Sequence, residues 1–234
     1  MYRKFSFSVG EFYHIYNRGN DKRDIFLNEE DRKRFIKLLF FCNSIKPVNI
    51  REVPKGQSFG EANKGETLTD IGVYCLMPNH FHILAKERVK NGISVFMKKL
   101  STGYSMYFNK KNERTGKLFE GAFKAVHVDS DEYLKYLFAY IHLNPIKLID
   151  SEWKEKGISD EEGAKDNLNN YKYSSYLDYI GQNREESMLL DKSAFPEYFA
   201  DFKEFNNFIS EWLNFQDETL EMDNKKVGDL INLR

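Results

Sequence analysis

Residues 71–85 read Ile-Gly-Val-Tyr-Cys-Leu-Met-Pro-Asn-His-Phe-His-Ile-Leu-Ala, two short apolar runs joined by Pro78-Asn79. Both runs are rich in β-branched and aromatic residues, and Pro-Asn favours a turn, so the stretch predicts two adjacent strands. Side chains two residues apart on a strand project from the same face. His80 and His82 therefore point the same way, and two imidazoles on a rigid sheet supply part of a metal site.

Similar patterns before and after this stretch predict the rest of the sheet and its helices. The expected order is strand–helix–strand–strand–helix–strand–helix. This order is typical of an α+β protein with a ferredoxin-like antiparallel sheet and helices on one face. The other expected strands are residues 11–16 and 123–128, and the expected helices begin at Asn28 and end before Pro47, span residues 93–112, and span residues 131–144 up to Pro145.

The composition is that of a globular protein, because 41% of the 234 residues are hydrophobic and 30% are charged. The length suits one domain with a full core and an appendage. No apolar run approaches the roughly 20 residues of a membrane span and the start does not resemble a signal peptide, so we expect a cytoplasmic protein without membrane association. Cys42 and Cys75 lie inside apolar runs and are interpreted as buried thiols, not as a disulfide.

Two parts of the chain carry opposite charge. Residues 1–149 hold 25 Lys and Arg against 16 Asp and Glu, whereas residues 150–234 hold 10 against 20. A basic body suggests an anionic polymer as partner. We therefore divide the chain into a basic domain, residues 1–149, and a C-terminal extension, residues 150–234. In the extension, residues 150–170 are interpreted as an acidic linker and residues 171–213 as mainly helical.

Residues 54–69 are rich in Gly, Ser and Lys and are expected to form a mobile insertion. Within them Gly60, Gly65 and Thr67 have the spacing of a phosphate-binding P-loop, but Glu66 stands where that loop needs its lysine. A carboxylate at this position would repel a triphosphate. No nucleotide cofactor is therefore expected.

The predicted helix that ends at Pro145 carries a polar aromatic stripe beside its apolar one. Tyr140 and Asn144 are four residues apart and share one face of that helix. If this face lies against the histidine pair, the Asn144 amide oxygen is a candidate third metal ligand. Two imidazoles, an amide oxygen and open positions suit Mg²⁺ or Mn²⁺, and such an ion would polarise a phosphate that a tyrosine attacks. The remaining histidines, His14, His127 and His142, are interpreted as structural.

Five motifs follow one another in a characteristic order. They are Tyr13-His-Ile-Tyr-Asn-Arg-Gly-Asn20, Cys75-Leu-Met-Pro-Asn-His-Phe-His82, Gly116-Lys-Leu-Phe-Glu-Gly121, Tyr140-Ile-His-Leu-Asn-Pro145 and Tyr173-Ser-Ser-Tyr176. Their order and spacing resemble those of the REP-associated tyrosine transposases, which belong to the single-tyrosine HUH transposase superfamily of insertion sequences. The resemblance covers roughly residues 10–181.

This resemblance implies a metal-dependent, single-stranded DNA endonuclease and strand transferase that acts on hairpin DNA through a 5′-phosphotyrosine intermediate. The hairpins would come from repeated extragenic palindromes or insertion-sequence ends. Tyr140 would be the nucleophile, His80 and His82 the histidine pair, and Asn144 the third ligand of Mg²⁺ or Mn²⁺. Within the family, both monomers and homodimers are expected.

The resemblance also indicates residues that contact DNA. One position departs from the family, because Ala122 stands where an Arg is common in the loop before the last strand. The residues expected to contact the DNA backbone are Asn17, Arg18, Lys117 and Lys124, and Phe119 is expected to stack on a base.

Two other functions stay open. A non-catalytic ferredoxin-like nucleic-acid-binding module would explain the fold and the basic domain, although such modules use exposed aromatic residues on their central strands. A metal hydrolase that activates water would keep its activity without Tyr140.

Overall fold

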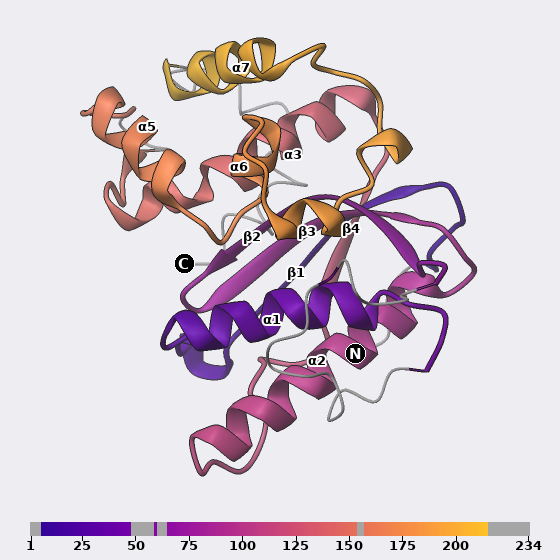
Figure 1. The fold of residues 1–234 in the computed structure, drawn as a ribbon. Helices are drawn as coiled ribbons and strands as arrows, with labels where there is room; N and C mark the ends of the chain where they lie inside the picture. The colour runs from indigo at the N-terminus through magenta and orange to yellow at the C-terminus, as the bar shows by residue number, and fades with distance from the viewer. Residues whose placement is uncertain (1–5, 48–58, 60–64, 154–156, 215–234) are drawn as a thin grey trace.

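The computed structural model describes residues 6–47, 59, 65–153 and 157–214. Within these residues, four strands form one antiparallel sheet in the order β2-β3-β1-β4 (Figure 1). Helix α1 connects β1 to β2 and helix α2 connects β3 to β4, so the predicted ferredoxin-like α+β fold is confirmed. The strands are β1 (Phe12–Arg18), β2 (Thr69–Met77), β3 (His80–Glu87) and β4 (Lys124–Val128).

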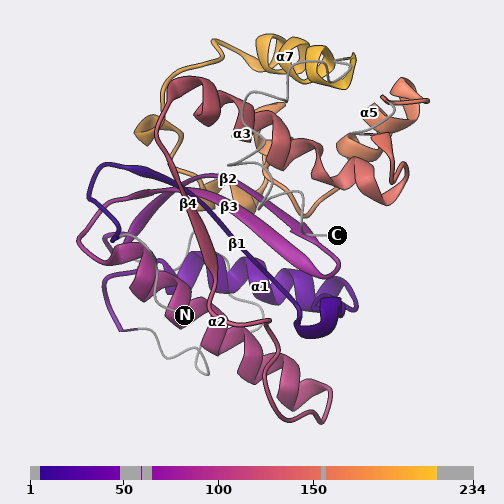
Figure 2. The same cartoon turned by 180° about the vertical axis from the view of Figure 1, so that it is seen from behind.

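Helices cover both faces of this sheet, whereas the sequence indicated one face. Helices α1 (Glu29–Cys42) and α2 (Gly92–Lys111) lie on one face, as predicted, and α3 (Asp131–Leu143) lies on the other (Figures 1 and 2). The reason is the composition of β2, in which every residue is buried. Tyr74 and Leu76 enter the core under α1 and α2, while Cys75 and Met77 enter a second core under α3. A strand that is apolar on both sides needs cover on both sides.

Local capping explains where two of the helices begin. The Asn28 side chain accepts a hydrogen bond of 3.1 Å from the Asp31 amide, and Ser130 accepts one of 3.1 Å from the Tyr133 amide. Both predicted starts are confirmed. Helix α3 ends at Leu143 and continues as a short 3₁₀ helix, η2 (Asn144–Leu148).

The linker interpretation of residues 150–170 is wrong over α5 (Glu161–Asn170). Asp160 caps this helix by accepting a 2.9 Å hydrogen bond from the Gly163 amide. The buried side of α5 consists only of Ala164 and Leu168, which are one turn apart. So narrow an apolar stripe is hard to recognise in the sequence among acidic neighbours.

Residues 171–213 are less helical than predicted. They contain α6 (Tyr176–Tyr179) and α7 (Phe202–Asn214), with short 3₁₀ helices η3 (Glu185–Leu189) and η4 (Lys192–Ala194) between them. Two isolated bridges attach this part of the chain to the edge of β2, because Ser174 pairs with Cys75 and Leu190 pairs with Ile71. Pairing with a sheet edge requires extended backbone and protects that edge from other strands.

The extension packs on the same second core as α3. Phe205, Phe208 and Ile209 of α7 are buried in the cluster that contains Tyr16 and Leu84 of the sheet. Figures 1 and 2 both show α7 running beside α3. The division of the chain at residues 149 and 150 stays a prediction.

Three further sequence predictions meet the structure here. Cys42 and Cys75 are buried free thiols, as predicted. Within the described segments, no helix has the length and apolar character needed to cross a membrane. The insertion predicted over residues 54–69 lies largely outside the described residues.

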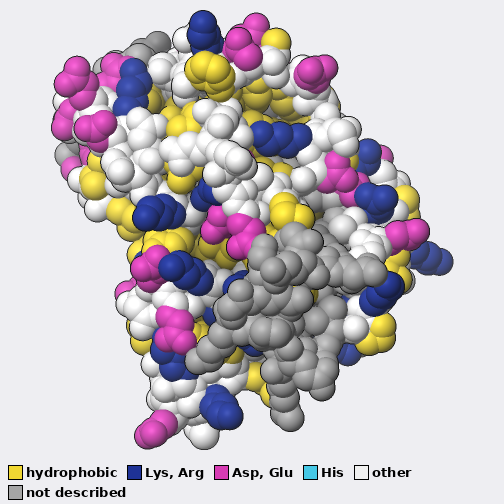
Figure 3. Space-filling model, in the orientation of Figure 1, with side chains coloured by type: hydrophobic (Ala, Val, Ile, Leu, Met, Phe, Trp, Pro, Cys, Tyr) yellow, Lys and Arg dark blue, Asp and Glu magenta, His cyan; other side chains and the backbone are white. Residues whose placement is uncertain are grey.

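Basic side chains do not gather into one patch on the face drawn in Figure 3. There, Lys and Arg are interspersed with Asp and Glu.

Candidate active site

The histidine pair lies on β3, on the face of the sheet that α3 covers. His82 is opposite Tyr16 of β1 and Cys75 of β2, and both of these neighbours belong to the core under α3. His80 is 8% exposed and His82 is fully buried. Their ring centroids are 5.0 Å apart at 87°. The alternation along the strand therefore does bring both imidazoles to one side, as predicted.

Tyr140 of α3 packs against this pair. Its ring meets the His82 ring edge to face, with 5.5 Å between centroids and 85° between planes. Tyr140 is only 7% exposed, and this burial raises the pKa of its phenol, while contact with the Asn144 side chain opposes the shift. The phenol is therefore protonated at neutral pH and has to lose its proton when it acts as a nucleophile.

Asn144 follows the last residue of α3 and is 3% exposed. Its Nδ2 donates a 2.7 Å hydrogen bond to the carbonyl oxygen of Tyr140. The amide is thereby held beside the Tyr140 phenol, one helical turn from it. The structure thus brings together four of the residues that the sequence indicated: His80, His82, Tyr140 and Asn144.

The surroundings of His80 define which ring nitrogen carries its proton. Its Nδ1 lies 2.5 Å from Oδ1 of Asn79. The Asn79 amide is oriented by its Nδ2, which donates to the Lys22 carbonyl oxygen at 3.2 Å. An amide oxygen only accepts hydrogen bonds, so Nδ1 of His80 must be the protonated nitrogen. The lone pair of His80 is then on Nε2, as a metal ligand requires.

This donor set fits a hard divalent cation. The described residues contain no group of three or more His, Cys, Asp or Glu side chains placed to hold a metal ion. The metal ligands that the sequence indicated would be the two imidazoles and the Asn144 amide oxygen. A set of three ligands leaves coordination positions open for water and phosphate oxygens, the ligands that Mg²⁺ and Mn²⁺ prefer.

His14 was interpreted as structural from the sequence, but it lies in the site. Its Nε2 is 2.9 Å from Nδ1 of His82, and the two rings stack with centroids 5.1 Å apart. Burial lowers the pKa of His14 to about 3, so it is neutral. The available signal was the alternation of His14 and Tyr16 on the first strand, yet only the β1–β3 register shows that they adjoin His82.

The other two histidines lie apart from the site. His127 hydrogen-bonds exposed Glu11 at 2.8 Å, and buried His142 hydrogen-bonds Ser175 at 2.8 Å. Both contacts agree with the structural interpretation.

Two of the predicted DNA contacts are engaged within the protein. Arg18 forms a two-pronged ion pair with Glu120, in which Nη2 is 2.9 Å from Oε1. Asn17 is 5% exposed, and its Nδ2 donates to the carbonyl oxygen of Gly121 at 3.2 Å. Both residues therefore tie β1 to the loop before β4. The Glu120 carboxylate competes with a DNA phosphate for the Arg18 guanidinium.

The prediction that Phe119 stacks on a base is wrong for this structure. Phe119 is 6% exposed and packs on Phe81 and Tyr104 in the core under α1 and α2. The cause is a bridge between Gly19 and Phe119, which turns the ring inward. Lys117 and Lys124 are exposed, as backbone contacts require, and Nζ of Lys124 lies 5.9 Å from the centroid of the Tyr16 ring beside the histidines.

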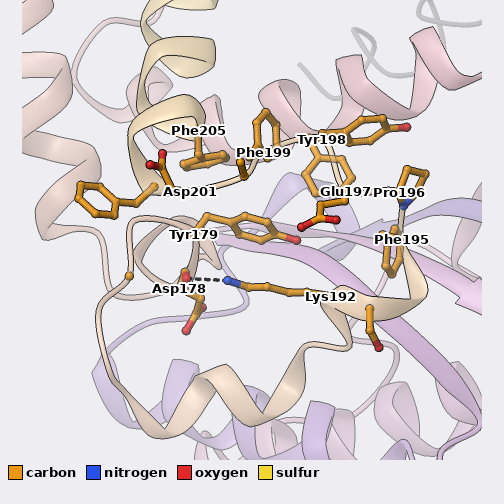
Figure 4. A pocket seen from close by; sticks show the side chains of 15 residues that line it. Asp178, Tyr179, Lys192, Phe195, Pro196, Glu197, Tyr198, Phe199, Asp201 and Phe205 are labelled. Carbon is orange, nitrogen blue, oxygen red and sulfur yellow. Dashed lines mark hydrogen bonds between the residues drawn. The ribbon is translucent and has the colours of Figure 1, made fainter.

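A cavity of about 780 Å³ lies elsewhere, between α3, α6, η4 and the start of α7 (Figure 4). Aromatic rings line it, and Lys192 enters it with Nζ 4.3 Å from the Tyr179 ring centroid and 2.7 Å from the Asp178 carbonyl oxygen. None of the predicted site residues lines this cavity. The candidate active site is thus a buried cluster beside α3 and does not coincide with this pocket.

Comparison with known proteins supports the resemblance to a transposase family and adds little about function. The family model described as "Transposase IS200 like" matches residues 57–144, a range that contains His80, His82, Tyr140 and Asn144. No curated protein matches the chain.

Two of the solved structures that resemble this fold are described by their identity and coverage. A REP-associated tyrosine transposase bound to a REP hairpin is 13% identical, with a TM-score of 0.47 over 86% of this chain and 90% of that one. The tRNA(His) guanylyltransferase of Saccharomyces cerevisiae is 12% identical, with a TM-score of 0.36 over 85% and 83%. Both TM-scores are below 0.5, so neither likeness supports an argument about function. Over residues 57–144 the chain matches the IS200-like transposase family, which confirms the resemblance that its motifs indicated.

Proposed function

We propose that this protein is a single-tyrosine DNA transposase that cleaves and rejoins single-stranded DNA at hairpins, with Mg²⁺ or Mn²⁺ as cofactor. The observation that carries the proposal is the contact between Tyr140 and His82, two residues of separate motifs whose rings pack 5.5 Å apart. The match of residues 57–144 to IS200-like transposases supports it. Hairpin DNA as substrate rests on the motif resemblance.

Tyr140 supplies the nucleophile in this proposal. Its Oη forms a bond to the scissile phosphorus as the bond from phosphorus to the 3′ oxygen breaks. The phenol loses its proton and the departing 3′ oxygen gains one. The products are a 5′-phosphotyrosine ester and a free 3′-OH end. Because the ester conserves the energy of the phosphodiester, rejoining needs no nucleotide.

The residues around Tyr140 hold the metal and the DNA. His80, His82 and Asn144 would bind the divalent ion, which when bound polarises the phosphate and stabilises its negative charge. Lys124, exposed next to Tyr16, is suited to bind a DNA phosphate. Exclusion of water by the packed aromatic rings favours attack by tyrosine over attack by water.

The test is a covalent adduct that survives SDS. A hairpin oligonucleotide with a single-stranded flank, labelled at its 3′ end, is incubated with protein and Mn²⁺. The label should move to the protein, whereas a 5′ label should be released on a fragment that a polymerase can extend. Tyr140→Phe should abolish the adduct and leave DNA binding nearly unchanged, and His80→Ala should abolish cleavage.

Tyr136→Phe is the matched control, since the Tyr136 ring stacks on Tyr140 at 5.7 Å and shares its helix face. It should retain the adduct. If Tyr136→Phe loses the adduct and Tyr140→Phe retains it, the nucleophile is Tyr136 and not Tyr140. Cleavage by Tyr140→Phe would instead indicate a hydrolase that activates water.

The burial of Tyr140 favours a second candidate, a nucleic-acid-binding module without catalysis. At 7% exposure the phenol reaches a phosphate only if the DNA or a neighbouring side chain rearranges. Hairpin binding by the parent protein, together with no adduct at any Mn²⁺ concentration and no Mn²⁺ binding that depends on His80, would establish this alternative.

A further inference from the structure

The environment of His82 differs from that of His80. His80 donates from Nδ1 to an amide oxygen, so its tautomer is fixed. His82 meets another imidazole, His14, whose Nε2 lies 2.9 Å from its Nδ1, and both rings are fully buried. An imidazole nitrogen can either donate or accept. The proton of this hydrogen bond can therefore belong to either residue.

The two positions of that proton have opposite consequences for a metal ion. If His14 donates, His82 carries its own proton on Nε2, and this nitrogen has no lone pair for a metal. If His82 donates from Nδ1, its Nε2 presents a lone pair. Only the second arrangement allows His82 to act as a ligand, and it requires a hydrogen-bond acceptor at position 14.

Packing alone does not explain a histidine at position 14. Nδ1 of His14 is buried and lacks a hydrogen-bond partner among the described residues. Burying such a group without a partner is unfavourable. A phenylalanine would stack on Tyr16, whose ring centroid is 5.1 Å away, without that penalty. The hydrogen bond to His82 is the one polar contact of His14 that the structure shows.

We propose that His14 is a positioning residue that accepts the Nδ1 proton of His82 and so presents Nε2 of His82 to the divalent metal ion. The inference rests on the proposed function, since it assigns the metal to the His80 and His82 pair. The imidazole of His14 supplies an acceptor that water cannot replace, because His14 is fully buried. His14 itself does not contact the metal or the DNA.

The test measures Mn²⁺ affinity of the full chain, from the electron paramagnetic resonance signal of free Mn²⁺. His14→Phe keeps the ring but removes the acceptor, and should weaken Mn²⁺ binding about ten- to a hundredfold. His14→Gln offers an amide oxygen as acceptor and should bind Mn²⁺ close to the parent affinity. His142→Gln, at a buried histidine outside the site, is the matched control for general loss of packing.

Three results would overturn the inference. Parent-like Mn²⁺ affinity in His14→Phe would show that the acceptor is irrelevant, and equal weakening in His14→Phe and His14→Gln would show a packing role. Parent protein that binds no Mn²⁺, or binds it equally after His82→Ala, would refute the proposed metal site itself. That last result is distinct, because it does not involve His14.

A second measurement on the parent protein does not depend on whether a variant folds. Long-range ¹H–¹⁵N spectra of the histidine rings report which nitrogen carries each proton. With saturating Mg²⁺, both His14 and His82 should be protonated on Nδ1. A proton on Nε2 of His82 in the metal-bound protein would refute the proposal.

Discussion

Arg184 connects the C-terminal extension to the sheet, and its replacement by methionine tests whether the extension is part of one folded unit. Its guanidinium donates to Asp178 at 2.9 Å and 2.5 Å, to the Tyr74 hydroxyl at 2.9 Å and to the carbonyl oxygens of Lys172 and Ser174 at 2.8 Å and 2.5 Å. The Arg184 side chain is 12% exposed and that of Asp178 is 1% exposed. Arg184→Met therefore leaves a carboxylate buried without its cation.

Removing one member of a buried ion pair costs about 3–5 kcal/mol. Because Arg184 keeps some contact with water, we expect the lower end, about 3 kcal/mol of unfolding free energy. For a chain of this length that corresponds to a fall in Tm of roughly 6–12 °C. Urea denaturation and scanning calorimetry measure both quantities.

The control is Lys165→Met, which breaks the exposed pair of Lys165 with Glu161 inside α5. Exposed pairs of this kind contribute about 0.5 kcal/mol, so its Tm should hardly move. A loss below about 1 kcal/mol in Arg184→Met would refute the reasoning. The extension would then not depend on this contact with β2.

Three shorter predictions follow from other contacts. Asn79→Ala removes the acceptor of the His80 Nδ1 proton and should weaken Mn²⁺ binding about tenfold, whereas Asn79→Asp, which keeps an acceptor, should not; titration with Mn²⁺ distinguishes them. Glu120→Gln releases Arg18, so hairpin affinity should rise and the salt dependence of binding should steepen by about one phosphate contact, and weaker binding would show that the ion pair orients the loop instead. Burial lowers the pKa of His142 to about 3 from 6.5, so the unfolded chain takes up its proton first as pH falls below 6.5 and stability declines. Between pH 7 and pH 5 this group should cost about 2 kcal/mol in denaturant unfolding, and His142→Gln should lose that part of the pH dependence; an unchanged slope would contradict it.

Sequence patterns predicted the local features of the site well, because those features depend on neighbours along the chain. Alternation on one strand puts His80 and His82 on one face, and the four-residue spacing puts Tyr140 beside Asn144. The expected helix starts at Asn28 and at residue 131 are correct. These results follow from the fixed periods of strand and helix.

Features that depend on residues far apart in the chain were missed. Phe119 lies among loop residues in the sequence, yet a bridge to Gly19 turns it into the core. Residues 161–170 form a helix whose apolar side is too narrow for its periodicity to be visible among acidic neighbours. Burial of these residues is decided by their packing on other elements of the fold, and no local pattern contains that information.

The sequence by itself determined the four strands of the sheet, the helices α1, α2 and α3, the common face of His80 and His82, and the motifs that resemble those of a transposase. Only the tertiary structure decided that α3 lies on the sheet face opposite α1 and α2, where Tyr140 meets His82, and that His14 lies behind His82. The physical reason is that periodicity states which side chains share a face of one element. Which elements meet, and in which register, depends on how all the apolar faces are buried together.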